Sequence, residues 1–350
     1  MADQIRGSVR GRAQVPLSIL DLAPLGVGQT PSEALATTTG LAQRADAWGY
    51  HRFWVAEHHG MPGIASSAPA VLLAHLGAAT RTIRLGAGGV MLPNHAPLIV
   101  AEQFGTLHAL HPGRIDLGLG RATNAATAAA LDRPEESANL FPRHVAELAD
   151  YLDDALPPGH RSPAIRAVPG RSVAPECGRP PIWLLGSSES SAKLAGTLGL
   201  PLAFAHHFSS KSTVPALQAY RRSFRRSAHL DKPYALISVA AIAADTTEQA
   251  HWLSGSAALL MVLLRRGKPG PVPSPEEAAA YPYTPQEREL VDPRRSTMVL
   301  GDAAKVRKDL AKLRARTGAD ELMITATVPD RAARYRSYEL IARACGLTES

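Results

Sequence analysis

Three consecutive polar residues, Glu57, His58 and His59, end an apolar run that begins at Phe53. Carboxylates and imidazoles transfer protons near neutral pH, and they are buried only where partners satisfy them. Neighbouring residues of a strand point to opposite faces, so at most one of the two histidines enters a barrel interior. This run is therefore a candidate reaction centre. The alternative is that Glu57 pairs with an arginine and one histidine faces solvent.

Metal ligation is a second interpretation of the histidines. His58 and His59 form one adjacent pair, and His206 and His207 form another. Because only one member of each pair can enter the interior, the four supply too few ligands for a metal centre. We therefore expect no metal site.

Glycine recurs in the next apolar segment, at Gly86, Gly88 and Gly89. Glycine inside a strand costs stability unless another group must approach the backbone closely. The pattern favours a flat, ring-shaped ligand lying against this strand, and a bulge at a barrel corner is the alternative.

Two further segments suit a phosphate group. One ends in Gly120 and Arg121, and the other in Ser187, Ser188 and Ser191, where a helix is expected to begin. Free N–H groups at a helix N-terminus, hydroxyls and an arginine bind phosphate well, although a serine-rich cap needs no ligand. Together with the glycine-rich strand, these residues predict a phosphorylated planar cofactor.

Short apolar runs alternate with segments of helical period along the whole chain, which is typical of repeated βα units. Eight such units favour a closed (β/α)8 TIM barrel, whose active site forms at the carboxyl ends of its strands. No glycine-rich turn opens a helix in the manner of a classical dinucleotide-binding fold. We expect strands near 17–22, 52–57, 83–91, 115–119, 182–185, 202–205, 236–241 and 321–326, and helices near 32–48, 69–79, 98–110, 142–156, 190–198, 215–229, 247–264, 303–317 and 331–345.

Composition and the proline-rich stretches complete the domain assignment. We expect residues 1–14 to be a disordered extension and residues 15–350 to be a single barrel domain with loop insertions near 157–181 and 267–295. The second insertion contains seven prolines and is expected to be a lid, or to be disordered without ligand. The net charge of +7 comes from scattered arginines without a recognition motif, which argues against nucleic acid as a partner. Two cysteines in unrelated contexts and the lack of a long apolar stretch predict a cytoplasmic protein that does not span a membrane.

Four segments, in this order and spacing, resemble the bacterial luciferase-like family of flavin-dependent monooxygenases. The likeness runs from about Pro16 to the terminal helix, and 299–302 and 318–323 resemble the family's closing elements. The four segments are 53–59, 86–97, 113–121 and 186–191, the last leading into 199–201.

The resemblance implies a barrel that binds reduced FMN (FMNH2) and reacts it with dioxygen (O2) to give a flavin C4a-peroxide. A separate NAD(P)H:flavin reductase usually supplies the FMNH2, and dimers are common. His58 matches the active-site histidine, with Glu57 supporting it and His59 facing away. Gly88 and Gly89 fall where the family often has a non-proline cis peptide under the flavin ring. Arg121, Gly120 and the three serines fall on the phosphate-binding positions.

Several features bear on the substrate and the reaction. Light-emitting members have a cysteine where this chain has Gly120, and a phenylalanine-rich loop where it has 60–64, which argues against bioluminescence and a long-chain aldehyde. His207 is expected as a second histidine over the flavin edge, with a rim position as the alternative. The sequence predicts an FMNH2-dependent monooxygenase acting on a small organic molecule of secondary metabolism, by hydroxylation, epoxidation or Baeyer-Villiger oxidation. The alternatives are an F420-dependent oxidoreductase on the same barrel and a non-catalytic flavin-binding protein.

Overall fold

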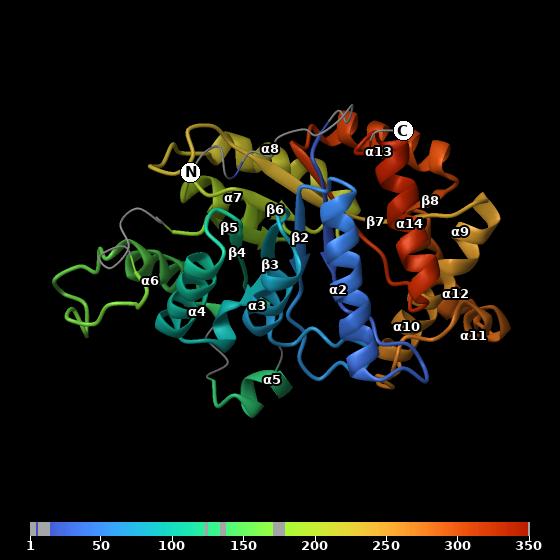
Figure 1. The fold of residues 1–350 in the computed structure, drawn as a ribbon, viewed down its shortest axis with the longest axis horizontal. Helices are drawn as coiled ribbons and strands as arrows, with labels where there is room; N and C mark the ends of the chain where they lie inside the picture. The colour runs from blue at the N-terminus through green and yellow to red at the C-terminus, as the bar shows by residue number, and fades with distance from the viewer. Residues whose placement is uncertain (1–4, 6–14, 123–124, 134–137, 171–178, 349–350) are drawn as a thin grey trace.

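Parallel strands form a closed barrel surrounded by helices (Figure 1). The computed structural model describes residues 5, 15–122, 125–133, 138–170 and 179–348. Neighbouring strands pair in the order β6-β5-β4-β3-β2-β1-β9-β7, and a further pairing of β6 with β7 closes the ring. The predicted (β/α)8 TIM barrel is confirmed. The strands are β1 (Leu17–Asp21), β2 (Arg52–Val55), β3 (Arg84–Met91), β4 (Ile115–Gly120), β5 (Ile182–Gly186), β6 (Leu202–Phe204), β7 (Ala235–Ala243), β8 (Val299–Gly301) and β9 (Glu321–Thr325).

Several helices begin at a side-chain cap or at a proline in the first turn. Thr30 accepts a hydrogen bond from the Glu33 N–H at the start of α2, and Ser188 accepts one from the Ser191 N–H at the start of α7. The helices are α2 (Pro31–Ala47), α3 (Pro69–Ala79), α4 (Pro97–Leu110), α5 (Ala125–Ala130), α6 (Phe141–Asp153), α7 (Glu189–Thr197), α8 (Thr213–Ser223), α9 (Thr247–Leu253), α10 (Gly255–Arg265), α11 (Pro275–Ala280), α12 (Pro285–Arg295), α13 (Ala303–Thr317) and α14 (Arg331–Ala344), with short 3-10 helices η1 (Leu92–Asn94) and η3 (Ser210–Ser212).

The structure differs from the predicted elements in several places, and helix α5 was not predicted. The helix predicted at 247–264 is broken at Ser254 into α9 and α10, and the helix predicted at 215–229 ends at Ser223. Strand β8 was not predicted, and within the described part of the chain it pairs with the C-terminal part of β7 alone. The second insertion, expected as a loop, contains helices α11 and α12. Most of the proposed N-terminal extension, and 171–178 of the first insertion, lie outside the described residues.

A buried ion-pair network fills the amino-terminal end of the barrel. The Arg52 guanidinium lies 2.8 Å from Asp116 Oδ2 and 2.9 Å from Glu321 Oε1, and Arg84 lies 2.5 Å from Asp116 Oδ1. Burial raises the pKa of Asp116, but Arg84 and Arg52 outweigh it and lower that pKa to about 2. Above this network the interior is apolar and is formed by residues such as Trp54 and Trp183. The charges at this end stabilise the fold, so the chemistry is expected at the opposite end.

The loops at the carboxyl ends of the strands are hydrogen-bonded to one another and to the second insertion. The Val272 N–H donates to the Leu25 carbonyl at 2.7 Å, and the Leu25 N–H donates to the Gly63 carbonyl at 2.9 Å. Helices α10, α11 and α12 lie together at the lower right of Figure 1, where Val291 packs with Ala258. The insertion is therefore joined to the barrel mouth by loops that follow β1 and β2. Among the described residues, the helices are too short or too polar to cross a membrane.

Candidate active site

His58 lies in the loop that follows β2. Arg52, Trp54 and Ala56 contact the barrel interior, and the same alternation, extended past the end of the strand, would place His58 on that side. The His58 N–H donates to the Ser66 carbonyl at 3.0 Å, which fixes the loop at this point. Burial lowers the pKa of the imidazole, with Glu57 opposing this effect. Its Nδ1 atom is buried and has no hydrogen-bond partner among the described residues.

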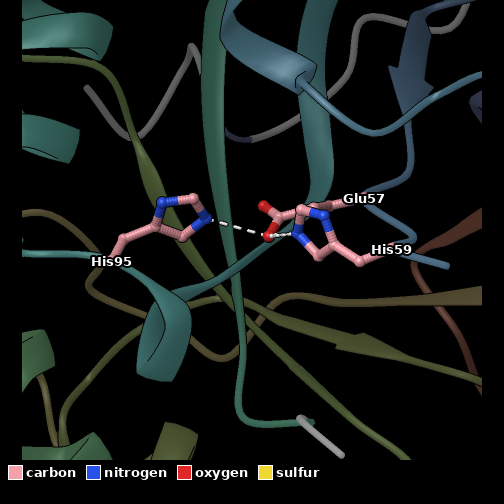
Figure 2. A group of neighbouring side chains, drawn as sticks. All are labelled: Glu57, His59 and His95. Atoms are coloured by element: carbon pink, nitrogen blue, oxygen red, sulfur yellow. Dashed lines mark hydrogen bonds and ion pairs between the residues drawn. The ribbon is translucent and has the colours of Figure 1, made fainter. Parts of the chain in front are cut away.

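Glu57 and His59 lie on the other side of the same segment. The buried Glu57 Oε1 accepts hydrogen bonds from His59 Nε2 and His95 Nε2, each at 2.8 Å, and Oε2 accepts one from the Met91 N–H at 3.1 Å (Figure 2). Burial raises the pKa of Glu57, but the hydrogen bonds from His95 and His59 outweigh burial and lower that pKa overall. The three side chains also form a group of potential metal ligands, which differs from the histidine set considered above. His95 was not among the predicted site residues.

The peptide bond between Gly88 and Gly89 is cis, at the position where the resemblance implied it. Internal packing, however, accounts for the lack of side chains here. A Cβ atom on Gly86 would lie 2.5 Å from Trp54 Nε1, and one on Gly88 would lie 2.8 Å from Leu20 Cδ1. The flat group against Gly86 is thus the indole of Trp54. Any cofactor contact at Gly88 and Gly89 would be made through the backbone.

The predicted phosphate-binding residues lie on two neighbouring strands. Leu119 pairs with Leu184, and the same register extended by two residues places Arg121 beside Gly186. The Arg121 and Ser187 side chains are exposed. Ser188 and Ser191, by contrast, cap the start of α7, because each hydroxyl oxygen accepts a hydrogen bond from the backbone N–H of the other residue.

Two glycines in this region make room for neighbouring side chains. A Cβ atom on Gly120 would lie 2.6 Å from Met91 Cε, and one on Gly186 would lie 2.0 Å from Ser191 Oγ. Among the described residues, Arg121 and Ser187 are therefore the predicted phosphate binders for which no side-chain partner is seen, and Gly120 has a packing role.

His207 follows β6 and faces His58 across the barrel mouth. Its Nδ1 atom hydrogen-bonds with Ser238 Oγ at 2.8 Å, and its ring lies 4.2 Å from that of the exposed Phe208. Burial lowers the pKa of His207 to about 4. The charges of His206 and His58 also lower this pKa, whereas the hydrogen bond with Ser238 raises it. His58 and His207 are therefore close enough to influence each other. His206 instead turns away and bonds Thr213 Oγ1 at 2.7 Å.

A family model described as luciferase-like monooxygenase matches residues 15–321. The chain belongs to this family. A luciferase-like monooxygenase of Escherichia coli K12 is 46% identical over 93% of this chain and 96% of its own length. The N-acetyl-S-alkylcysteine monooxygenase of Bacillus subtilis is 36% identical over 94% of this chain and 98% of its own. The solved structure of apo-MsnO8 is 38% identical, with a TM-score of 0.84 over 96% of this chain and 100% of that one.

These relatives place this luciferase-like monooxygenase among the oxidoreductases. The family match also agrees with the geometry, because it spans β1 to the start of β9 and so includes His58 and His207.

Proposed function

We propose that this luciferase-like monooxygenase is the oxygenating component of a two-component system that uses FMNH2 and O2 to oxygenate a small organic substrate. The observation that carries the proposal is that His58, after β2, and His207, after β6, follow strands on opposite sides of the ring and lie close enough for His58 to affect the pKa of His207. The His58 Nδ1 atom also has no hydrogen-bond partner among the described residues. A bound flavin or substrate would lie between the two histidines.

The residues at the mouth fit a flavin mononucleotide in both of its parts. The backbone at Gly88 and Gly89 would support the ring system, and Arg121 with Ser187 would hold the phosphate. Reduced flavin, when bound, supplies the electrons with which dioxygen is activated.

The protein's own side chains would then bind, orient and shield the reactants. His58 would hydrogen-bond the flavin or the substrate and exchange a proton with it. His207, fixed by Ser238, would present its other ring nitrogen from the opposite side of the mouth. Glu57 would hold the loops after β2 and β3 in register through His95 and Met91. The insertion attached at Val272 would close over the mouth and exclude water.

The substrate is proposed to be a small molecule of secondary metabolism, and the reaction a hydroxylation, epoxidation or Baeyer-Villiger oxidation. The Bacillus relative named for N-acetyl-S-alkylcysteine supports a small organic substrate. The proposed site of action is the cytoplasm, where a separate NAD(P)H:flavin reductase would supply FMNH2.

A second copy of the chain is the proposed partner at helices α3 and α4. These neighbouring helices expose Val71, Ile99 and Leu110, with exposed fractions of 73%, 48% and 61%. Exposed apolar side chains on adjacent helices are typical of an interface. Analytical ultracentrifugation should show a homodimer that the substitution Val71→Glu dissociates, and a monomeric wild-type protein would refute the dimer.

Flavin titration of an Arg121→Ala variant tests the cofactor site. Loss of a charge-assisted phosphate contact is expected to weaken FMN binding by about 1.5–3 kcal/mol, or roughly 10- to 150-fold in Kd. Arg307→Ala, on the exposed side of α13, is the matched control and should bind FMN as the wild type does. Equal affinity in both variants would place the phosphate elsewhere. Tight binding of F420 instead of FMN would favour an F420-dependent oxidoreductase, and flavin binding without turnover would favour a non-catalytic role.

A further inference from the structure

Glu57, His59 and His95 bring three metal-ligating atoms together beside the active site. Glu57 Oε1, His59 Nε2 and His95 Nε2 all lie within 4.8 Å of one another (Figure 2). Both imidazole nitrogens are 2.8 Å from the same carboxylate oxygen. Two imidazoles and one carboxylate form a ligand set that binds zinc and similar divalent ions while leaving further coordination positions open.

The spacing of these atoms is close to the spacing that a metal ion requires. Ligand atoms bound at about 2.1 Å to one ion are separated from each other by roughly 3.0–3.4 Å. Each imidazole would therefore withdraw from Glu57 Oε1 by only a few tenths of an ångström. The two imidazole nitrogens, which lie within 4.8 Å of each other, would also have to reach this separation. The side chains of His59 and His95 are each 29% exposed, so both rings have room to move and solvent can reach the site.

The surroundings of Glu57 also suit a metal ligand. Its side chain is fully buried and its pKa is lowered, so it is the anionic form that faces the two imidazoles. Its second oxygen accepts the Met91 N–H, an outer hydrogen bond of the kind that orients metal-binding carboxylates.

From this geometry we infer that Glu57, His59 and His95 form a binding site for a divalent transition-metal ion of the zinc class. Ligation through Nε2 moves the single proton of each neutral imidazole to Nδ1. The bound ion would replace two hydrogen bonds with stronger bonds between the loops that follow β2 and β3. The inference is independent of the proposed oxygenation, because it concerns binding to the flavin-free protein.

Metal titration of flavin-free, chelator-treated protein tests the site. Co²⁺ serves as the probe because its visible absorption reports inner-sphere coordination, and Zn²⁺ is then added as a competitor. The variants are His59→Ala, His95→Ala and Glu57→Gln. His75→Ala is the matched control, since His75 is an exposed histidine on α3 that bonds only Thr39 among the described residues.

We expect one Co²⁺ per chain in wild type and in His75→Ala, displaced by Zn²⁺, and an affinity reduced about 100-fold or more in the three site variants. Zn²⁺ should also raise the Tm of wild type and of His75→Ala, but not that of His59→Ala or His95→Ala. If Glu57→Gln does not fold, the two histidine variants carry the test, because their side chains are partly exposed. Failure to bind one equivalent, or binding that these variants leave unchanged, would overturn the site and leave a hydrogen-bonded cluster.

Discussion

His95 Nε2 donates a hydrogen bond of 2.8 Å to Glu57 Oε1, although 38 residues separate them in the chain. The contact joins the loop after β2 to the segment that follows η1. It is strengthened by the Met91 N–H, which donates to the other Glu57 oxygen at 3.1 Å. Glu57 is thus the link between the segment that carries His58 and the end of the strand that contains the cis Gly88–Gly89 peptide.

Replacing Glu57 by alanine should reduce stability measurably. The substitution leaves the Met91 N–H without its acceptor and removes two further hydrogen bonds, so the free energy of unfolding should fall by about 1–3 kcal/mol. Denaturant unfolding measures the change. Glu102→Ala, on the partly exposed side of α4, is the control and should lie within about 0.5 kcal/mol of wild type. A Glu57→Ala protein as stable as this control would show that the link contributes nothing.

Arg52→Met should be far more damaging than the loss of an arginine at the surface. The variant leaves Asp116 and Glu321 buried without their shared cation, which costs about 3–5 kcal/mol of unfolding free energy. Arg336→Met breaks an exposed pair with Asp245 and should cost no more than about 1 kcal/mol. Denaturant melts of the two variants provide the comparison, and similar costs would contradict a structural role for the buried network.

Gly86→Ala tests the packing explanation for the glycine-rich strand. The added Cβ atom would meet Trp54 Nε1 at 2.5 Å and Asp116 Cβ at 2.9 Å, so overpacking should cost about 1–3 kcal/mol even without any ligand. Gly159→Ala adds a Cβ atom in open space and should change stability by less than about 0.5 kcal/mol. Thermal unfolding of flavin-free protein decides the matter. If Gly86→Ala loses flavin affinity but no stability, a ligand rather than Trp54 requires the glycine.

Stability should fall as the pH is lowered from about 6.5 to about 4. Burial lowers the pKa of His206 in the folded state to about 4, whereas an unfolded histidine titrates near 6.5. The unfolded chain therefore binds the proton first, and stability that is fully present above pH 6.5 is lost as the pH falls through this window. His51 and His207, whose pKa values are also lowered to about 4, add to the effect.

The substitution His206→Gln measures the contribution of His206 to this pH dependence of stability. The variant should show a shallower decline in Tm between pH 6.5 and pH 4, because one proton fewer is taken up on unfolding. Identical slopes in the wild type and in His206→Gln would mean that His206 is protonated in the folded state as readily as in the unfolded one.

The sequence predicted helix and strand bounds closely where local residues alone determine where an element begins and ends. The helices α3 and α13 were predicted to the residue, because proline or a capping side chain begins them and polar or glycine residues end them. The long helix at 247–264 failed because the Ser254 hydroxyl donates to the His251 carbonyl, and Gly255 follows it.

The helices of the second insertion were missed although their signals were readable. The prolines at 275 and 285 are two of the seven that led us to expect a loop insertion at 267–295. Each instead occupies the first turn of a helix, behind Ser274 or Thr284 and ahead of a glutamate that completes the capping box.

The site was predicted only in part, because local patterns do not specify how its loops pack. Strand alternation places His58 inside and His59 with Glu57 on the other side, and that much follows from position in the chain. The partnership of Glu57 with His95 depends instead on how two loops pack, which no local pattern specifies. In the same way, the residue types at Gly86 and Ser188 suggested ligands, while the structure gives them packing and capping roles.

The most direct test of the central claim is the reoxidation of FMNH2 on the protein. The purified chain is titrated anaerobically with FMNH2, mixed with O2, and followed by flavin absorbance, beside His58→Ala and free FMNH2. We expect stoichiometric FMNH2 binding, and reoxidation that is slower than that of free FMNH2 in wild type and altered in His58→Ala. Reoxidation indistinguishable from that of free FMNH2, or turnover that consumes reduced F420 without O2, would contradict the proposed FMNH2-dependent oxygenation.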